Sequence, residues 1–342
     1  MKVLVIGYSG YIGSRLMALM RTDPRWTAVG ASRHAAAGFL RLDTCDEAAL
    51  TRALCQVDAV VHCVAGSAKA IAEGARTLVR AARTSGVRSI VHLSSMAAYG
   101  ELDQPVDETT PLGHAHGWYA RAKQQAEAQL LALAREPHPA ASTPRVTVLR
   151  PGCVWGPGST LWVGRIVRWL RQGRLGDLGA AGDGWTHGVM VDDVCIAILR
   201  SLQRPAEVGL PRVLNLAAPD SPRWNTWFTD LALAVGATPL RRIRPGQLLA
   251  DGWVLGPPLY LARRLLSAAG GDVKALPEPI SPTLLRLWRR PLRMDASEAT
   301  RVLDLAWTPY PQALRQCVAA LSADPAKAAG ASCPPPDAAR AP

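Results

Sequence analysis

The chain has 342 residues, 49% of them hydrophobic, and a mean hydropathy of +0.05. These values exclude a disordered protein, and the length allows one large core with a smaller appended lobe. The net charge of +12 raises the question of nucleic-acid binding, but the arginines are spread along the chain and form no basic block with interleaved aromatic residues. We therefore expect no nucleic-acid partner.

The cysteine pattern and the apolar runs bear on the compartment. Seven scattered cysteines form no Cys-x-x-Cys pair, which favours reduced thiols over a disulfide framework or a metal site. No apolar run approaches the roughly 18 residues that span a bilayer, and the chain enters a strand directly after Met1 and Lys2, without a signal-peptide pattern. We predict a cytoplasmic protein with no metal ion and no stable membrane insertion.

The first element is a buried strand, Val3–Ile6, followed at once by Gly7, Gly10 and Gly13 and then by apolar residues at helical spacing over Ser14–Met20. A glycine-rich turn between a strand and a helix directs backbone N–H groups and the positive end of the helix dipole at one point. This pattern predicts a dinucleotide site. The residues expected to contact the cofactor here are Gly7, Tyr8, Ser9, Gly10, Tyr11, Ile12 and Gly13.

The second strand, Thr27–Ala31, ends in Ser32 and Arg33. An acidic residue at this place would accept the adenosine ribose hydroxyl of NAD, whereas an arginine accommodates the 2′-phosphate of NADP. Because Arg33 is present and no Asp or Glu is, the sequence favours NADP, with NAD as the alternative. Ser32 and Arg33 are the predicted contacts.

A third strand is predicted at Leu40–Asp43, with Asp43 beside the adenine; an equally open interpretation is that Asp43 caps a helix from Asp46 to Leu54. The fourth strand, Val57–Ala65, contains His62 as a packed residue and brings Ala65 close to the dinucleotide.

A helix over Ile71–Thr84 then leads to a fifth strand, Ser89–Leu93. The repeated alternation of strand and helix predicts an α/β fold, a doubly wound parallel (Rossmann) sheet.

Two polar motifs follow the fifth strand. The first runs from Ser95 to Tyr99 and Gly100, and the second places Lys123 four residues after Tyr119. Residues four apart lie on one helix face, so the ammonium group should lie beside the phenol. A neighbouring cation lowers a tyrosine pKa from about 10 by favouring the phenolate. Such a tyrosine is suited to give a proton to a carbonyl oxygen or to take one from an alcohol.

With the glycine turn, these motifs resemble the signatures of the extended short-chain dehydrogenase/reductases, the NAD-dependent epimerase/dehydratase family, and within it the 3β-hydroxysteroid dehydrogenases and dihydroflavonol reductases. The resemblance implies that Ser95, Tyr119 and Lys123 are catalytic, that Ser95 bonds the substrate oxygen and that Lys123 also holds the nicotinamide ribose. One departure is Ile71, which occupies the place of the family's usual Asn.

The second half extends the resemblance. The strand Val146–Arg150 leads into Pro151, which the resemblance puts near the nicotinamide, and Asp193 stands where the family starts a late helix, as a structural cap rather than a catalyst. His187 occupies the place where sugar-nucleotide members carry a pyrophosphate-binding Arg, which weakens a nucleotide-sugar function. The similarity continues to Leu305-Ala-Trp-Thr-Pro309.

Two stretches allow several interpretations. Four arginines three residues apart would line one helix face: Arg165, Arg168, Arg171 and Arg174. This face is interpreted as a solvated surface or as a surface that attracts an anionic substrate or carrier. Alternatively, Arg165 or Arg168 substitutes for the missing pyrophosphate-binding Arg. The apolar and arginine-rich region 239–293 includes an amphipathic helix near Leu259–Leu266, which suits a lid over a hydrophobic substrate, an oligomer wall or, third, a membrane-surface helix.

We divide the chain into a Rossmann dinucleotide-binding core (1–150), a mixed region that completes the core and forms a C-terminal substrate-binding lobe (151–322), and a disordered tail (323–342). The leading hypothesis is an NADP-dependent oxidoreductase that moves hydride between the nicotinamide and a carbonyl or secondary alcohol of an apolar small-molecule substrate. The alternatives are a nucleotide-sugar epimerase or dehydratase, and a non-catalytic NADP-binding sensor or scaffold. A homodimer is compatible with all three.

Overall fold

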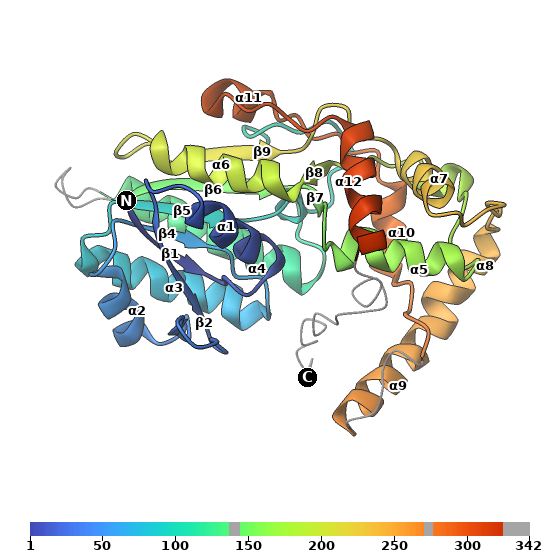
Figure 1. Ribbon diagram of the computed structural model, residues 1–342, viewed down its shortest axis with the longest axis horizontal. Helices are drawn as coiled ribbons and strands as arrows, with labels where there is room; N and C mark the ends of the chain where they lie inside the picture. The colour runs from blue at the N-terminus through green and yellow to red at the C-terminus, as the bar shows by residue number, and fades with distance from the viewer. Residues whose placement is uncertain (137–143, 270–275, 324–342) are drawn as a thin grey trace.

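Seven parallel strands form the main sheet of the protein, in the order β3-β2-β1-β4-β5-β6-β9 (Figure 1). The computed structural model describes residues 1–136, 144–269 and 276–323. The strands are β1 Lys2–Ile6, β2 Thr27–Ser32, β3 Leu40–Arg41, β4 Ala59–His62, β5 Ser89–Leu93, β6 Arg145–Pro151 and β9 Arg212–Leu216. Because β1 pairs with β2 on one side and β4 on the other, the strand order reverses beside β1, where doubly wound sheets bind ligands.

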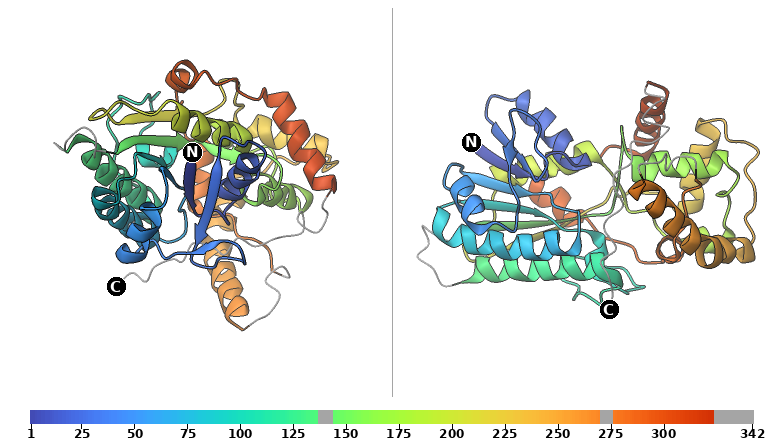
Figure 2. Two further views of the ribbon diagram at one scale, coloured as in Figure 1. Left: turned by 60° about the vertical axis from the view of Figure 1, so that its left-hand side comes forward. Right: turned by 90° about the horizontal axis from the view of Figure 1, so that it is seen from below.

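Helices cover both faces of this sheet. Successive side chains of β1 point to opposite faces, so Val3 and Val5 pack on one side and Leu4 and Ile6 on the other. The first face carries α1 Tyr11–Arg21, α6 Val191–Gln203 and α11 Ser297–Leu303, and the second carries α2 Glu47–Leu54, α3 Ala68–Ser85 and α4 Gly117–Arg135 (Figures 1 and 2). The predicted Rossmann architecture is confirmed.

A smaller helical lobe packs beyond the carboxyl end of the sheet, at the right of Figure 1. It holds a parallel strand pair, β7 Cys153–Trp155 and β8 Gly188–Met190, and a core of buried tryptophans. Its helices are α5 Arg165–Arg171, α7 Trp224–Ala234, α8 Pro245–Leu249, α9 Gly256–Ala268, α10 Pro282–Arg289 and α12 Tyr310–Ala323, and its buried tryptophans are Trp155, Trp169, Trp224, Trp227 and Trp288. The predicted C-terminal lobe is therefore present.

Several elements are shorter than the sequence predicted. Strand β3 ends at Arg41 because Asp43 accepts the N–H of Cys45 (3.0 Å) and turns the chain; Asp46, not Asp43, caps α2. Strand β4 ends at His62, and the carbonyl of Val64 is taken by a side chain instead of a strand.

The chain after residue 151 contributes both to the sheet, through β9 and α6, and to the helical lobe. The boundaries at 150 and 322 stay a prediction, and the predicted tail lies outside the described residues from 324 onward. Within the described ranges, no helix has the length and apolar character needed to cross a bilayer.

Candidate active site

The glycine turn is closely packed against itself. Gly7 has a φ of +88° and donates its N–H to Ala31 (2.8 Å), and a Cβ on Gly13 would lie 2.3 Å from the Gly7 carbonyl oxygen. Gly10 precedes α1 as its N-cap and supplies no side-chain cap. The first N–H groups of α1 therefore stay available to an anion, and this cradle fits the pyrophosphate of a dinucleotide.

The side chains of the two tyrosines in this turn pack into the protein. The Tyr8 ring stacks on Phe39 at 4.0 Å between centroids, and its hydroxyl accepts the N–H of Ala36 (3.0 Å). Tyr11 packs against the second lobe, because a Cβ on Gly156 would lie 3.1 Å from its hydroxyl oxygen. Ser9 and Gly10 are exposed, and Ile12 is half-buried. The cradle is thus formed by backbone, with Tyr8 and Tyr11 as supports.

A hollow lies where β2 ends, lined by Arg33, His34, Ala35, Ala36 and Arg41. The lining includes no carboxylate, and the Arg33 guanidinium extends over Gly66, whose Cβ position is 3.7 Å from Nη2. The Ser32 hydroxyl is buried beside it with no hydrogen-bond partner in the protein. Asp43 is exposed, with one carboxylate oxygen accepting the N–H of Cys45. The sequence singled out Arg33 but missed Arg41, which β3 places beside Ser32 and which lines the same hollow.

Ser95 and Tyr119 come together although 23 residues separate them in the numbering. Ser95 follows β5 and accepts the N–H of Ala97 (3.2 Å), while Tyr119 lies in the first turn of α4. A hydrogen bond with Ser95 lowers the pKa of Tyr119, but burial has the larger effect and raises it above the usual value for a phenol. The Tyr119 hydroxyl is therefore protonated at neutral pH in the protein alone.

Lys123 is almost completely buried, one turn after Tyr119 on α4. Its ammonium nitrogen lies 5.8 Å from the Tyr119 ring centroid and donates to the carbonyls of Leu93 (2.6 Å) and Val64 (3.0 Å). Burial lowers the pKa of Lys123 to about 8. An ammonium group has three N–H donors, so one is left after these two bonds, and a ribose hydroxyl is a suitable acceptor for it.

A buried polar network lies one further turn along α4 and was not foreseen. Glu127 accepts hydrogen bonds from Ser94 and from Arg150, whose Nη2 is 2.7 Å away in a buried ion pair. The guanidinium also lies over the Tyr99 ring at 4.8 Å. The spacing of four residues from Lys123 to Glu127 is a sequence signal that could have indicated this third member of the helix face.

His62 and His92 form a second unforeseen pair. They are register partners on β4 and β5, both fully buried, with their Nδ1 atoms 2.9 Å apart. Burial lowers the pKa of His62 to about 3 and that of His92 well below its usual range, and the Lys123 charge adds to both effects. Both rings are neutral, so one Nδ1 donates and the other accepts. The prediction that His62 is a packed strand residue agrees with this position.

The remaining predicted residues line the same edge of the sheet. Ala65 follows β4 and is exposed, and Pro151 ends β6 beside Leu216. Since the carboxyl ends of parallel strands share one edge, the glycine turn, Ser32, Ala65, Ser95 and Pro151 all lie along it.

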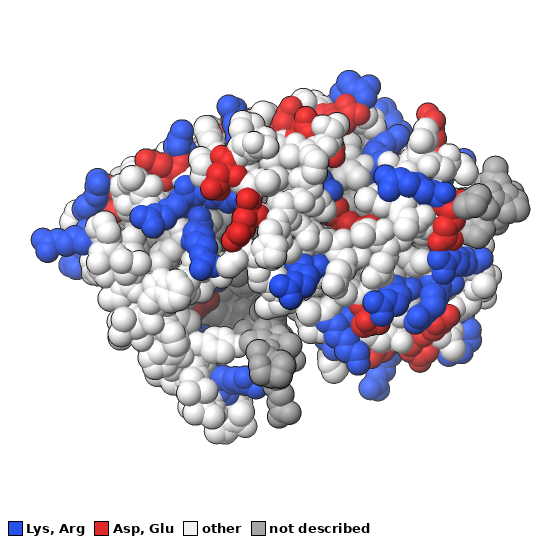
Figure 3. All heavy atoms as spheres, turned by 180° about the vertical axis from the view of Figure 1, so that it is seen from behind, with Lys and Arg blue, Asp and Glu red and all other residues white. Residues whose placement is uncertain are grey.

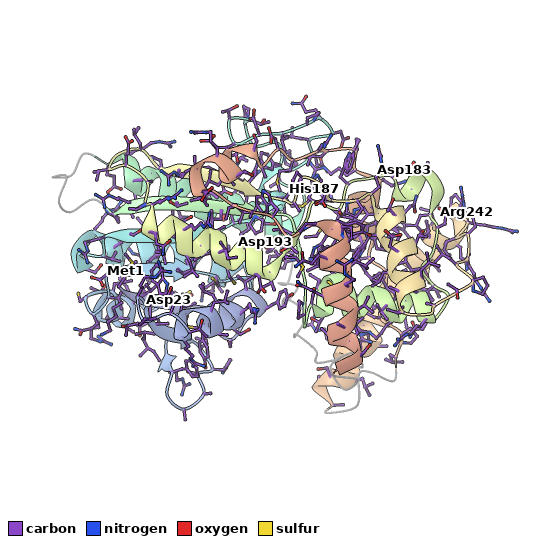
Figure 4. All side chains as sticks on the ribbon, turned by 45° about the horizontal axis from the view of Figure 1, so that its top comes forward. Met1, Asp23, Asp183, His187, Asp193 and Arg242 are labelled. Atoms are coloured by element: carbon purple, nitrogen blue, oxygen red, sulfur yellow. The ribbon has the colours of Figure 1, made fainter. Side chains whose placement is uncertain are left out.

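His187 and Asp193 lie where the sheet meets the helical lobe (Figure 4). Burial lowers the pKa of His187 to about 4, with Arg290 and Arg293 contributing. Asp193 accepts the N–H (2.9 Å) and the hydroxyl (2.8 Å) of Thr308, so it ties two segments together and does not cap its own helix.

The predicted arginine row is only partly on a helix, because α5 ends at Arg171. Arg168 pairs with Glu278 (2.6 Å), Arg174 donates to the Glu278 carbonyl (2.7 Å), and Arg165 lies 3.9 Å from the same carboxylate. These three side chains hold the helical lobe together instead of forming a solvated face.

The sequence from residue 3 to residue 217 matches the NAD dependent epimerase/dehydratase family. This match covers more than half of the chain, and the chain belongs to this family. The class that the sequence predicted, an NAD(P)-dependent enzyme of the extended short-chain dehydrogenase/reductase type, is thereby confirmed.

Two curated relatives illustrate the range of the similarity. The 2-alkyl-3-oxoalkanoate reductase of Stenotrophomonas maltophilia (strain K279a) is 29% identical over 58% of this chain and 64% of its own length. The N-acetyl-alpha-D-glucosaminyl-diphospho-ditrans,octacis-undecaprenol 4-epimerase of Escherichia coli O157:H7 is 28% identical over 52% of this chain and 56% of its own. The chain thus spans about three fifths of the length of these curated relatives.

Similarity of structure extends further than similarity of sequence. The dTDP-glucose 4,6-dehydratase of Bacillus anthracis str. Ames, solved in complex with NAD, superposes with a TM-score of 0.71 over 95% of this chain and 97% of that one, at 18% identity. At this identity the likeness establishes the fold.

Proposed function

We propose that the protein is an NADP-dependent oxidoreductase that transfers hydride between the nicotinamide and a carbonyl or secondary alcohol of an apolar substrate. The observation that carries the proposal is the gathering of Ser95, Tyr119 and Lys123 at the carboxyl edge of the sheet, beside the strand-reversal point. A small-molecule substrate, a cytoplasmic location and a homodimer are parts of the same proposal.

The nicotinamide, when bound, supplies or accepts the hydride. In the reducing direction, the protonated Tyr119 hydroxyl gives its proton to the carbonyl oxygen of the substrate, while Ser95 donates a hydrogen bond to the same oxygen and orients it. The Lys123 ammonium stabilises negative charge on the Tyr119 oxygen and holds the nicotinamide ribose through its third N–H. The raised pKa of Tyr119 favours reduction, because the side chain starts as an acid.

The preference for NADP is supported by the hollow at the end of β2. Arg33 and Arg41 present two guanidinium groups there, and the Ser32 hydroxyl has no partner within the protein. Guanidinium groups bind phosphate oxygens in pairs of parallel hydrogen bonds, so this lining suits a 2′-phosphate better than a free hydroxyl. NAD, which the Bacillus anthracis dehydratase binds, is the alternative cofactor.

An apolar substrate is supported by the state of two basic side chains in the second lobe, one of which is neutral and the other already paired. His187 is neutral at pH 7 because its pKa is lowered to about 4, and Arg168 is already paired with Glu278. Neither supplies free positive charge for a pyrophosphate. The Stenotrophomonas maltophilia relative is named a 2-alkyl-3-oxoalkanoate reductase, and such a compound carries a ketone between alkyl groups together with a carboxylate.

A nucleotide-sugar or diphospho-sugar epimerase is the second candidate. Arg293 contributes to the lowered pKa of His187 and offers a cation from another segment in place of the missing arginine; Arg290 contributes too but already donates to the carbonyls of Gly100 and Leu102. The Escherichia coli relative is a 4-epimerase of a diphospho-linked sugar. A non-catalytic NADP sensor is a third candidate, but it would not need Ser95, Tyr119 and Lys123 in contact.

A substrate screen separates these candidates. Purified full-length protein is incubated with NADPH and either 2-alkyl-3-oxoalkanoates or UDP- and dTDP-sugars, and NADPH absorbance and product composition are followed. Ketone-dependent loss of NADPH supports the proposal. Sugar epimerisation without net cofactor oxidation supports the second candidate, and binding of NADPH with no turnover of any substrate supports the sensor.

A further inference from the structure

One segment of the helical lobe exposes apolar side chains that a folded protein usually buries. We call residues 245–269 the projecting arm; it comprises α8, the wide helical turn Ala250–Leu255 and α9. Of the 15 large apolar side chains that are exposed among the described residues, seven lie between positions 249 and 265. They are Leu249, Trp253, Val254, Leu255, Tyr260, Leu261 and Leu265.

The base of the arm is anchored while its outer part leaves the body of the molecule. Leu248 is buried, a Cβ on Gly252 would lie 3.0 Å from Leu285 of α10, and Arg263 donates to the Leu276 carbonyl (2.6 Å). From Leu248 and Gly252 outward, α9 extends away from the sheet and the lobe, and the Arg263 bond lies partway along it (Figures 1 and 2). Trp253 is 58% exposed and Leu265 is 62% exposed, so the outward surface is apolar.

Charge on the arm has one sign at its surface. The arm contains a single acid, Asp251, which is half-buried and paired with Arg174 (3.2 Å). Its cations are Arg263 and the exposed Arg264, which lies one turn from Leu261. Figure 3, which views the molecule from behind, shows the arm at lower left as a largely uncharged surface with Lys or Arg near its end.

The apolar surface and the positive charge of the arm distinguish between two possible binding partners, a second copy of the protein and a lipid membrane. Two copies meeting through this face would bring the exposed Arg264 of each copy together, and the carboxylate of the arm, Asp251, is already paired with Arg174. A bilayer of anionic phospholipid supplies both an apolar layer for Leu and Val and negative head groups for Arg264, and Trp and Tyr favour the boundary between the two. The excess of positive charge over the whole chain, +12, attracts the same surface over a longer range.

We propose that the projecting arm docks the protein on the surface of an anionic phospholipid membrane, with Trp253, Leu261 and Leu265 buried at the interface and Arg264 against the head groups. Because α9 carries Arg263 and Arg264 within its 13 residues, it lies in the surface plane of the bilayer and does not cross it. This inference does not rest on the proposed catalytic function.

Flotation of the full-length protein with lipid vesicles tests the proposal. Vesicles made of phosphatidylglycerol and phosphatidylcholine in equal molar amounts should carry the wild-type protein upward. The bound fraction should be several-fold smaller with vesicles of phosphatidylcholine alone, and also when salt is added to the anionic vesicles. The double variant Leu261→Glu/Leu265→Glu should lose about tenfold or more in apparent affinity, and Arg264→Glu several-fold. The matched control is Leu210→Glu, because Leu210 is 64% exposed and lies outside the arm. This control variant should bind the vesicles as the wild-type protein does.

Circular dichroism and thermal unfolding establish that each variant is folded before it is compared. Absence of wild-type flotation with the anionic vesicles, or equal flotation of the double variant, would overturn the proposal. Sedimentation velocity without lipid addresses the other occupant: a wild-type dimer that the double variant converts to a monomer would assign the face to a second copy and overturn membrane docking.

Discussion

The ammonium nitrogen of Lys123 lies 2.6 Å from the carbonyl oxygen of Leu93, in the strand that leads to Ser95. This bond fixes the lysine beneath Tyr119, and burial lowers its pKa to about 8. The positive charge is therefore present below pH 8 and lost above it. We expect the affinity for NADPH to fall as the pH rises from 7 to 9, as measured by fluorescence titration. Lys123→Met should bind more weakly at pH 7 and show no such fall; a wild-type affinity that is constant over this range would contradict the assignment.

Tyr119→Phe removes the proposed acid and keeps the ring. Because general acid catalysis contributes about 10²- to 10⁴-fold, kcat for ketone reduction should fall by that factor while NADPH binding stays unchanged. Tyr260→Phe, on the exposed surface of α9, is the control and should keep full activity. Turnover by the Tyr119 variant at the wild-type rate would remove this residue from the mechanism.

Arg33→Ala should erase a preference for NADPH over NADH. The guanidinium of Arg33 borders the hollow at the end of β2, and a charge-assisted hydrogen bond contributes roughly 1.5–3 kcal/mol, so NADPH affinity should fall about tenfold or more while NADH affinity changes little. Arg41→Ala should act in the same direction, and the exposed Arg135→Ala provides the control. Equal affinity of the wild type for both cofactors would refute the argument.

Glu127→Ala should destabilise the protein strongly. The carboxylate is paired with Arg150 in a buried site, and removing one partner leaves an uncompensated charge, which costs about 3–5 kcal/mol. Glu73→Ala is the matched control: it breaks the exposed Glu73–Arg76 pair, and its free energy of unfolding should change by less than about 1 kcal/mol. Urea denaturation at pH 7.5 measures the free energy of unfolding of both variants. Similar decreases in the two variants would show that the buried ion pair contributes no more to stability than the exposed one.

The protein should lose stability in mild acid. His62 and His187 have folded-state pKa values near 3 and 4, below the unfolded value of about 6.5, so the unfolded chain binds more protons as the pH drops below 6.5. The free energy of unfolding should fall toward pH 4, by up to about 1.4 kcal/mol per pH unit for each buried histidine. His92→Phe should weaken this pH dependence, whereas the exposed His114→Ala should leave it unchanged. Urea midpoints at pH 7.5, 6 and 5 provide the comparison.

The sequence predicted correctly those features in which the residue pattern of one short segment reflects its place in the folded protein. The run Val3–Ile6 is apolar without interruption because both faces of β1 are covered. A glycine is required at position 13 because a Cβ there would clash with the carbonyl oxygen of Gly7. The spacing of Tyr119 and Lys123 survives in the structure because both lie on α4. Their proximity to Ser95 depended on the expectation that β5 ends beside that helix.

Other features depend on contacts between distant segments that no local pattern carries. Lys123 binds the carbonyl of Val64, a residue that the sequence placed in the fourth strand, and desolvation raises the Tyr119 pKa, which the sequence predicted to be lowered. The pairing of His62 with His92 required knowledge of the register between β4 and β5. The grouping of arginines around Glu278 likewise joins residues more than 100 positions apart.

The contact between Tyr11 and Gly156 has a mechanical consequence. The ring of Tyr11 leaves the first turn of α1 and rests against the loop that follows β7, so the cradle for the pyrophosphate and the entrance to the helical lobe share a wall. Because a phenol ring does not compress, we expect a shift of the glycine turn to displace the loop after β7 as well. Binding of a nucleotide at the turn should then also alter the position of that loop.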